Sequence, residues 1–456
     1  PFTIVDSQFG VTNPVAMLHL PGDKDNSDKY VGNFWAELEL YKNLKYKSSF
    51  GVDMGFWGND GYTMPYYLGI ANYIDQSSVW STMYKSFTWL VENLLTYNFN
   101  IYDHQFNFLL GQSAQSSNSH YVGGVSYDIR NPRQPYIDAT DKASNERGAW
   151  GSPSAFHRLA SYFGKIGYNY AEKYIVEATL RRDGSSNFGR KRRWANFPSI
   201  SAGWTITNEE FMKDKIDFLS SVKLRASWGR NGNQSIGEFG YTSTIAGNVN
   251  YILGMEGLNV IAPGSTPTAY SNPFLRWEES EQTNIGFDTY FFNGALSFTF
   301  DWFNKRTNGM LMTMALPQYI GNSRPTGNVG DMQNQGVELD LKYRFRFDQF
   351  RFNVGGNASY IKNTLIKLGN ETGWANYDTA LGGVGTFTRA ENGQPFPFFY
   401  GMQTDGIFQT EQEVQDYVNK NGELLQPSAK PGDVRFVDSN KDGVIDEFDR
   451  VNIGNG

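Results

Sequence analysis

The sequence has 456 residues, with 40 Lys and Arg against 47 Asp and Glu, and a net charge of -7 at pH 7. An acidic chain does not offer the clustered basic face that phosphate recognition requires, so nucleic acid is not an expected partner. Cysteine is absent, which excludes disulfide bonds, thiolate metal sites and a thiol nucleophile. Aromatic residues make up 16% of the chain and glycine occurs 48 times, a composition that favours one large all-β architecture.

The hydropathy of the chain restricts how it could meet a membrane. The mean hydropathy is -0.50, and no run of about 18 apolar residues occurs, so the sequence contains no transmembrane helix. A membrane β-barrel remains compatible with these values, because its strands need apolar residues only at alternate positions.

In chain order, period-two segments form pairs with very short connections. The pairs are 34–41 with 44–53, 87–98 with 104–114, 156–170 with 174–182, and 284–292 with 295–306, the last joined by Asn293-Gly294. The connections between pairs, 55–86, 115–155, 230–278 and 362–394, are long and polar. One connection differs: 207–220 predicts a short helix capped near Asn208. Tight turns alternating with long loops are typical of outer-membrane barrels.

The clearest strand pair lies between Val337 and Ile361, around Asp348-Gln349. Strand side chains alternate between faces, so one face of this hairpin is apolar and the other is ionic. The apolar positions are Val337, Leu339, Leu341, Tyr343 and Phe345, and the ionic positions are Glu338, Asp340, Lys342, Arg344 and Arg346. On 295–306, Leu296, Phe298, Phe300 and Trp302 are likewise predicted to face lipid.

Several strings between about Tyr162 and Arg450 share their order and spacing with one known family. They include Arg181-Arg182-Asp183-Gly184-Ser185-Ser186-Asn187-Phe188-Gly189, Leu224-Arg225-Ala226-Ser227-Trp228-Gly229, Trp277-Glu278-Glu279, Asn334-Gln335-Gly336-Val337-Glu338-Leu339 and Asp405-Gly406-Ile407-Phe408-Gln409. With these strings the chain resembles the SusC-type TonB-dependent transporters of the Gram-negative outer membrane, the RagA/SusC family.

The resemblance implies a transmembrane antiparallel β-barrel of 22 strands, of which residues 1–456 would form a part with long extracellular loops. It implies outer-membrane lipid as surroundings and a SusD-like lipoprotein as a lid. The imported nutrient would be an oligosaccharide or a peptide, and energy would come from the TonB complex. We expect the plug domain and the TonB-contacting N-terminal region to lie outside this chain, which would be an internal piece of a longer protein.

Residues 411–450 are expected to form an extracellular loop region with a short helix and a metal site. The segment 438–449 matches the twelve-residue calcium loop, in which position 6 is Gly443. The predicted ligands are Asp438, Asn440, Asp442, the Val444 carbonyl, Asp446 and Asp449. Asp449 stands where an EF-hand has glutamate, and its shorter side chain favours a weaker Ca²⁺ site or one that accepts Mg²⁺. An alternative is a turn rich in solvated carboxylates.

The sequence offers no support for catalysis. The four histidines are scattered and no nucleophile motif occurs, so we expect a protein that is not an enzyme. For ligand contact, exposed loop aromatics are the candidates, because rings stack on sugars and peptides. These are Trp57, Tyr62, Trp374, Tyr377 and Phe387, which could equally pack the loops or join an aromatic girdle.

Three functional readings remain open. The first, implied by the resemblance, is TonB-dependent import. The second is a soluble or surface all-β adhesion or carbohydrate-binding module with a calcium-stabilised loop, and the third is a passive porin.

Overall fold

The computed structural model describes residues 14–20, 22–69, 72–140, 148–213, 215–243, 245–247, 249–253, 260–267, 270–314, 323–381 and 385–455. For residues 154–155, 252–253, 260–261, 377–381 and 385 it describes the backbone alone. The described residues fall into two units, one within 1–99, 107–166 and 181–187, the other within 100–106, 167–180 and 188–456.

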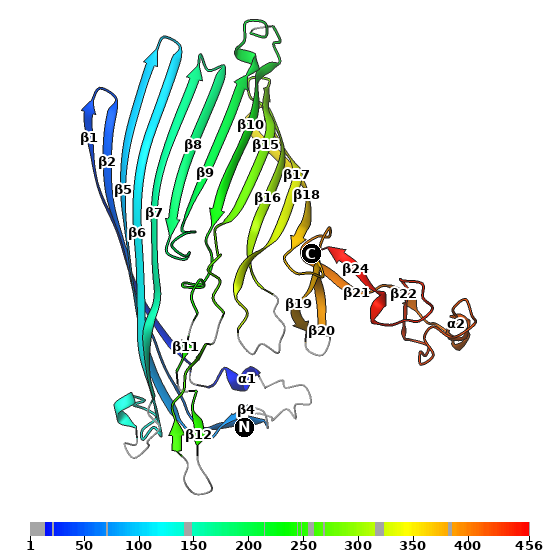
Figure 1. Ribbon diagram of the computed structural model, residues 1–456. Helices are drawn as coiled ribbons and strands as arrows, with labels where there is room; N and C mark the ends of the chain where they lie inside the picture. The colour runs from blue at the N-terminus through cyan, green and yellow to red at the C-terminus, as the bar shows by residue number, and fades with distance from the viewer. Residues whose placement is uncertain are drawn as a thin grey trace. The chain divides into compact units, whose positions relative to one another are not determined.

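One sheet of 12 strands dominates the chain, and strands that follow one another in it are hydrogen-bonded neighbours (Figure 1). In order these are β1 (Lys24–Tyr41), β2 (Leu44–Thr63), β5 (Ser78–Ile101), β6 (His104–Tyr127), β7 (Gly148–Tyr170), β8 (Tyr174–Ser185), β9 (Trp194–Thr205), β10 (Leu219–Asn233), β15 (Glu278–Phe291), β16 (Leu296–Thr313), β17 (Thr326–Phe347) and β18 (Phe350–Leu368). The all-β fold class is therefore confirmed.

Smaller elements lie in the connections. The strand pairs are β3 (Tyr66–Gly69) with β4 (Asn72–Ile74), β11 (Ile245–Ala246) with β14 (Thr266–Pro267), β12 (Tyr251–Leu253) with β13 (Val260–Ala262), and β22 (Thr404–Ile407) with β23 (Val434–Phe436). A sheet of 4 strands contains β19 (Trp374–Leu381), β20 (Gly385–Glu391), β21 (Phe398–Met402) and β24 (Arg450–Asn455). The helical turns are α1 (Pro14–Met17), η1 (Ile137–Ala139), η2 (Ile206–Asn208), α2 (Glu411–Asp416) and η4 (Glu447–Asp449). Among the described helices, none is long and apolar enough to cross a membrane.

The long connections are shorter than the sequence predicted, because the strands extend into them. β2 continues to Thr63 and β5 begins at Ser78, although 55–86 was expected to be loop. β6 extends to Tyr127 and β18 to Leu368 in the same way. These extensions carry Gly, Ser and Asn on both faces, so they lack the alternation that marks a half-apolar strand, while their backbones still pair with neighbours.

The hairpin predicted at 337–361 is confirmed, with Asp348-Gln349 as its turn. Phe347 pairs with Phe350, and the antiparallel register continues through Glu338 opposite Ser359. Asp348 has a φ of 51°, the left-handed conformation that a tight turn requires. The turn between β15 and β16 differs from the two-residue prediction, since Phe292, Asn293 and Gly294 all have positive φ and four residues separate the strands.

The short helix predicted at 207–220 is wrong for the described part of that segment. Its described backbone forms the 3₁₀ turn η2 and separate single turns, in one of which Met212 N and Lys213 N donate to the Glu209 carbonyl. The Glu209 side chain does not serve as a helix cap, because it accepts hydrogen bonds from side chains of neighbouring strands. Glu209 therefore forms tertiary hydrogen bonds in place of the helix cap that the local sequence pattern predicts.

Candidate functional sites

The ionic face of the sheet holds a charge cluster across three adjacent strands of the second unit. Arg225 on β10 bonds Asp288 on β15, with Nε to Oδ2 at 2.7 Å and Nη2 to Oδ1 at 3.1 Å. Its Nη2 also bonds Asp301 Oδ2 on β16 at 3.0 Å. Gly286 lies between them, and a Cβ there would come within 2.2 Å of Asp301 Oδ1. This face pairs its half-buried charges across strands, which favours a confined polar lumen.

The opposite face of the sheet is apolar and uncovered on the neighbouring strand β17. Leu339, Leu341 and Tyr343 are 39%, 49% and 43% exposed, and Phe347 is 72% exposed. A contiguous apolar surface of this kind is unfavourable in water and suits the hydrocarbon of a membrane. Contact with the hydrocarbon of a membrane would therefore explain why apolar residues alternate with polar ones in the hairpin.

Aromatic rings gather beside the tight turns. Tyr170, Tyr174 and Trp204 form a stacked row with ring centroids 6.3 and 6.5 Å apart, and Phe218 stacks on Phe291 at 6.3 Å. Tyr and Trp concentrate at membrane–water interfaces, because their rings are apolar and their polar atoms reach water. The row therefore fits one of the two aromatic girdles of a membrane barrel.

Glu209 anchors this row and was not singled out from the sequence. It is buried, and its Oε1 accepts hydrogen bonds from the Tyr174 hydroxyl and from Trp204 Nε1, while Oε2 pairs with Lys173 Nζ at 3.2 Å. The hydrogen bond from Tyr174, followed by that from Trp204, lowers the pKa of the Glu209 carboxyl below its ordinary value. No local motif signals this role, since Lys173 and Tyr174 lie 36 and 35 residues away in the sequence.

The first two ring candidates for ligand contact lie on β2, in the first unit, and not in a loop. Trp57 is 40% exposed and stacks on Tyr84 with centroids 5.4 Å apart, and Tyr84 stacks in turn on Tyr121 at 5.4 Å. Tyr62 is half-buried opposite Val79. The ladder of three rings supports the packing alternative for Trp57, although the exposed part of its side chain stays accessible.

The other three candidates belong to the second unit. The Arg389 guanidinium lies 3.9 Å from the centroid of the Trp374 ring, and Phe387 stacks on Phe399 at 6.3 Å. The backbone of Tyr377 pairs with Thr388, while its side chain lies outside the described atoms. The candidates are thus distributed over two units instead of forming one described cluster, and their role in ligand contact stays a prediction.

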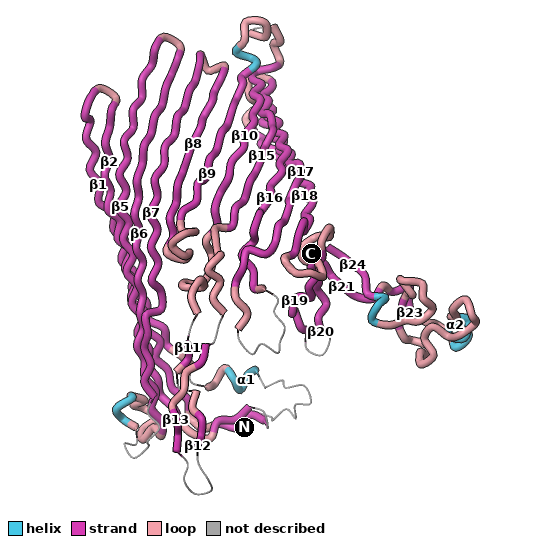
Figure 2. The backbone as a smooth tube through the Cα atoms, viewed as in Figure 1, coloured by secondary structure: helices cyan, strands magenta, loops and turns pink. Residues whose placement is uncertain are grey.

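The loop 438–449 adopts several features of a calcium loop. It follows β23 in a segment that Figure 2 draws mostly as loop. Gly443 has a φ of 93°, and its N–H donates to Asp438 Oδ2 at 2.9 Å. The other Asp438 oxygen, Oδ1, is buried without a hydrogen-bond partner. A buried carboxylate oxygen without a donor is costly unless a cation or water satisfies it.

The remaining predicted ligands take part in turns of the same loop. Asn440 Oδ1 accepts from Asp442 N at 2.8 Å, and Asp446 Oδ1 accepts from Phe448 N at 2.8 Å. Asp449 is fully buried, and its carboxylate accepts from the backbone N–H groups of Ser439, Asn440 and Asp446. Among the described residues, no three His, Cys, Asp or Glu side chains are gathered closely enough to hold a metal ion.

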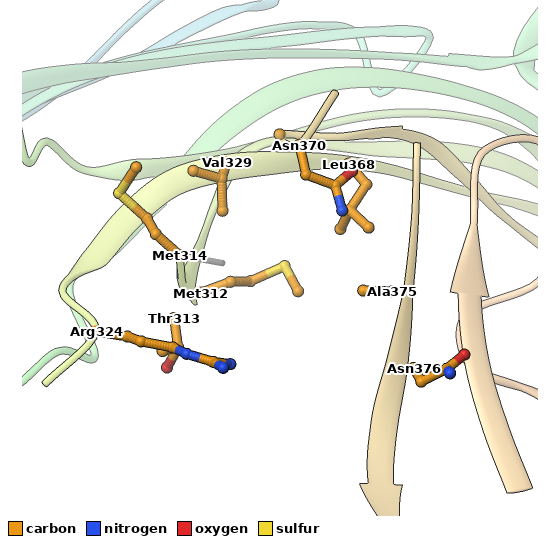
Figure 3. Close-up of a pocket in the computed structure, with 10 residues that line it drawn as sticks. Met312, Thr313, Met314, Arg324, Val329, Leu368, Asn370, Ala375 and Asn376 are labelled. Carbon is orange, nitrogen blue, oxygen red and sulfur yellow. The ribbon is translucent and has the colours of Figure 1, made fainter. Parts of the chain in front are cut away.

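A pocket of about 360 Å³ lies where β16 and β18 end and β17 begins, beside the start of β19 (Figure 3). Met312, Met314, Val329 and Leu368 supply its apolar walls, and Arg324 and Asn376 lie at its polar side. No sequence motif predicts this site, because its walls come from four separate segments of the chain.

Comparison with known proteins identifies the fold family. Residues 7–414 match the family described as TonB dependent receptor-like, beta-barrel. The chain belongs to this family. It is therefore part of an outer-membrane β-barrel of a Gram-negative bacterium, and the transmembrane barrel predicted from the hairpins is confirmed.

Individual relatives support the same family assignment. The chain is 29% identical, over 99% of its length and 44% of the relative's, to the TonB-dependent receptor P3 of Formosa agariphila. It is 28% identical, over 96% of its length and 42% of the relative's, to the TonB-dependent receptor SusC of Bacteroides thetaiotaomicron. The solved structure of the RagAB peptide transporter has the same fold, with a TM-score of 0.77 and 24% identity over 90% of this chain and 44% of that one.

The chain thus spans less than half the length of these relatives. The relatives are named as receptors and transporters, which confirms the expectation of a protein that is not an enzyme. The family also decides against a soluble sheet, the second reading left open by the sequence.

Proposed function

We propose that the protein containing this chain imports a nutrient, an oligosaccharide or a peptide, across the outer membrane with energy supplied through TonB. The observation that carries the proposal is the two-faced sheet, whose apolar face is uncovered and whose ionic face pairs its charges across strands. The similarity to SusC and to a structure named as a peptide transporter supports it. In this account the ionic face of the hairpin meets a plug domain, which a passive porin would lack.

The proposed partner is a SusD-like lipoprotein that covers the extracellular mouth. The test is affinity purification of the full-length protein from detergent-solubilised outer membranes, followed by mass spectrometry of associated proteins. We expect a lipoprotein in stoichiometric amount, and we expect uptake of the nutrient to stop in cells without TonB. Purification without a lipoprotein, combined with uptake independent of TonB, would contradict the proposal.

We also propose that the loop 438–449 binds Ca²⁺, with Mg²⁺ as the competing ion. The unpartnered Asp438 Oδ1 and the positive φ of Gly443 support this proposal. Oxygen atoms of Asp438, Asn440, Asp442 and Asp446 and the Val444 carbonyl would hold the ion. Asp449 would contribute its charge while its oxygens keep the loop closed through backbone N–H groups. The ion would thereby stabilise the segment between β22 and β24.

A further inference from the structure

The pocket of Figure 3 lies on the ionic face of the sheet. Leu365 pairs with Met332, and Met332 occupies an even position of β17 together with Glu338 and Asp340. Paired residues of antiparallel strands place their side chains on the same face. Leu368 pairs with Gly330 on that face after the irregularity at Ile366, and Leu368 lines the pocket. The pocket therefore opens on the lumen side of the barrel wall.

The pocket also lies at the end of the strands remote from the tight turns. Met312 is 16 residues from Leu296, the first residue of β16. A tilted strand needs only about 9–11 residues to cross the hydrocarbon core, so Met312 lies beyond the membrane on the long-loop side. A solute arriving at the barrel from that side would meet this pocket before it reached the part of the wall that crosses the membrane.

The side chains of the pocket favour a ligand that is both apolar and anionic. Met312 and Leu368 pack against the buried Leu365 and Ala390, which fixes an apolar floor. Arg324 is the ionisable residue of the lining, it is exposed, and among the described residues it has no hydrogen-bond or ion-pair partner. A guanidinium beside thioethers suits a carboxylate attached to an apolar group. Neutral sugars suit the floor poorly, because their hydroxyls would lose hydrogen bonds to water.

The wall formed by β19 adds a backbone feature. β19 is an edge strand of its sheet in the described residues, since it pairs with β20 alone, and its residues Ala375 and Asn376 line the pocket. An edge strand presents unpaired N–H and C=O groups, to which an extended peptide can add as a further strand. A volume of about 360 Å³ is near the lower end of the roughly 300–1,000 Å³ of small-ligand sites, which suits the end of a ligand.

We propose that this pocket binds the C-terminal residue of a peptide, with its carboxylate on Arg324 and its apolar side chain on Met314 and Leu368. The inference rests on the proposed import function and names peptide as the substrate class. The Asn370 side chain holds the start of β19 in place. Its Nδ2 donates to Trp374 O at 2.7 Å, and its Oδ1 accepts from Gly373 N at 3.0 Å.

The test is a calorimetric cycle on the full-length protein purified in detergent. The probes are the peptide acetyl-Ala-Ala-Leu with a free carboxylate and the same peptide with a C-terminal amide. We expect the wild type to prefer the acid by about tenfold or more, as charge-assisted bonds of Arg to carboxylate require. Arg324→Gln should remove this preference while leaving amide binding nearly unchanged, and Arg324→Lys should restore part of it.

The matched control is Arg190→Gln, which removes an exposed arginine outside the pocket and should keep the preference. Met314→Ala should weaken both peptides, because it shortens the apolar wall. Equal binding of acid and amide by the wild type, or an equal loss of both in Arg324→Gln, would overturn the proposal. The proposal would also be overturned if a neutral oligosaccharide competed with the peptides for the pocket and Arg324→Gln weakened the oligosaccharide as much as the acid peptide.

Failure of this inference is separable from failure of the proposed function. If the lipoprotein co-purifies and uptake requires TonB, but no acid preference exists, then only the peptide assignment falls. If partner and TonB dependence are absent as well, then import itself is wrong.

Discussion

Asp438 occupies the first position of the proposed ion site and satisfies only half of its own carboxylate. Its Oδ2 holds Gly443 N in the turn, while the buried Oδ1 faces no donor. Water or a cation must complete this environment, because an unsatisfied buried oxygen costs about 1–3 kcal/mol. The residue pattern alone indicates the predicted ligands. That the two oxygens of Asp438 have different environments is seen only in the structure.

The prediction for this site compares two variants of equal charge change. Asp438→Asn removes a ligand charge and should weaken Ca²⁺ binding by roughly tenfold or more, since the loss of even an outer-shell partner typically costs about 10–100-fold. Glu447→Gln lies in the same loop at a position that is not a predicted ligand, and it should leave the affinity nearly unchanged. Calorimetric titration of the full-length protein with CaCl₂ measures both. Equal affinities in the two variants and the wild type would remove the metal assignment.

At the scale of single elements, the hairpin β17–β18 could be predicted because several independent features of its sequence indicate the same structure. Alternation, turn residues and strand length all indicate the same register, which the structure contains. The strand ends in the long connections were not predictable, since their pairing depends on neighbouring backbones and not on side-chain pattern. The Arg324 pocket could not be predicted from the sequence for a similar reason, because its lining comes from or beside β16, β17, β18 and β19.

The two faces of this hairpin make a prediction about stability. Leu341 is 6 residues from Phe347 along β17, which places it roughly 15 Å above the turn, near the middle of a hydrocarbon core of about 30 Å. Leu341→Arg should therefore destabilise the folded barrel by about 2–4 kcal/mol in a lipid bilayer.

The control for this substitution places the same side chain on the other face. Ser359 pairs with Glu338 on the ionic face, so Ser359→Arg should cost much less. Urea unfolding of the full-length protein in lipid vesicles measures both variants. A loss from Ser359→Arg as large as that from Leu341→Arg would contradict the facing of the hairpin.

At the scale of the whole molecule, a hydrophilic average composition and a membrane location coexist. The mean hydropathy of -0.50 results from strands that are apolar on one face only and that extend beyond the membrane as polar ribbons. The family assignment and the sheet order support the same architecture from independent directions. The sequence resemblance implied a nutrient importer, but it could not distinguish a glycan from a peptide, since that choice depends on side chains brought together by folding.

The central claim, that the sheet crosses the outer membrane with its apolar face in lipid, can be measured by spin-label accessibility. This chain contains no cysteine, so after replacement of any cysteines outside it, single cysteines can be placed in the full-length protein in vesicles. They are placed in turn at two adjacent residues of one strand, on each of four strands. The pairs are Trp89 and Thr88, Ala226 and Ser227, Phe298 and Ser297, and Leu339 and Glu338. The first member of each pair should be accessible to oxygen dissolved in lipid and protected from a water-soluble nickel chelate, and the second should not show this lipid signature. Equal accessibility to the nickel chelate at both members of every pair would contradict the account.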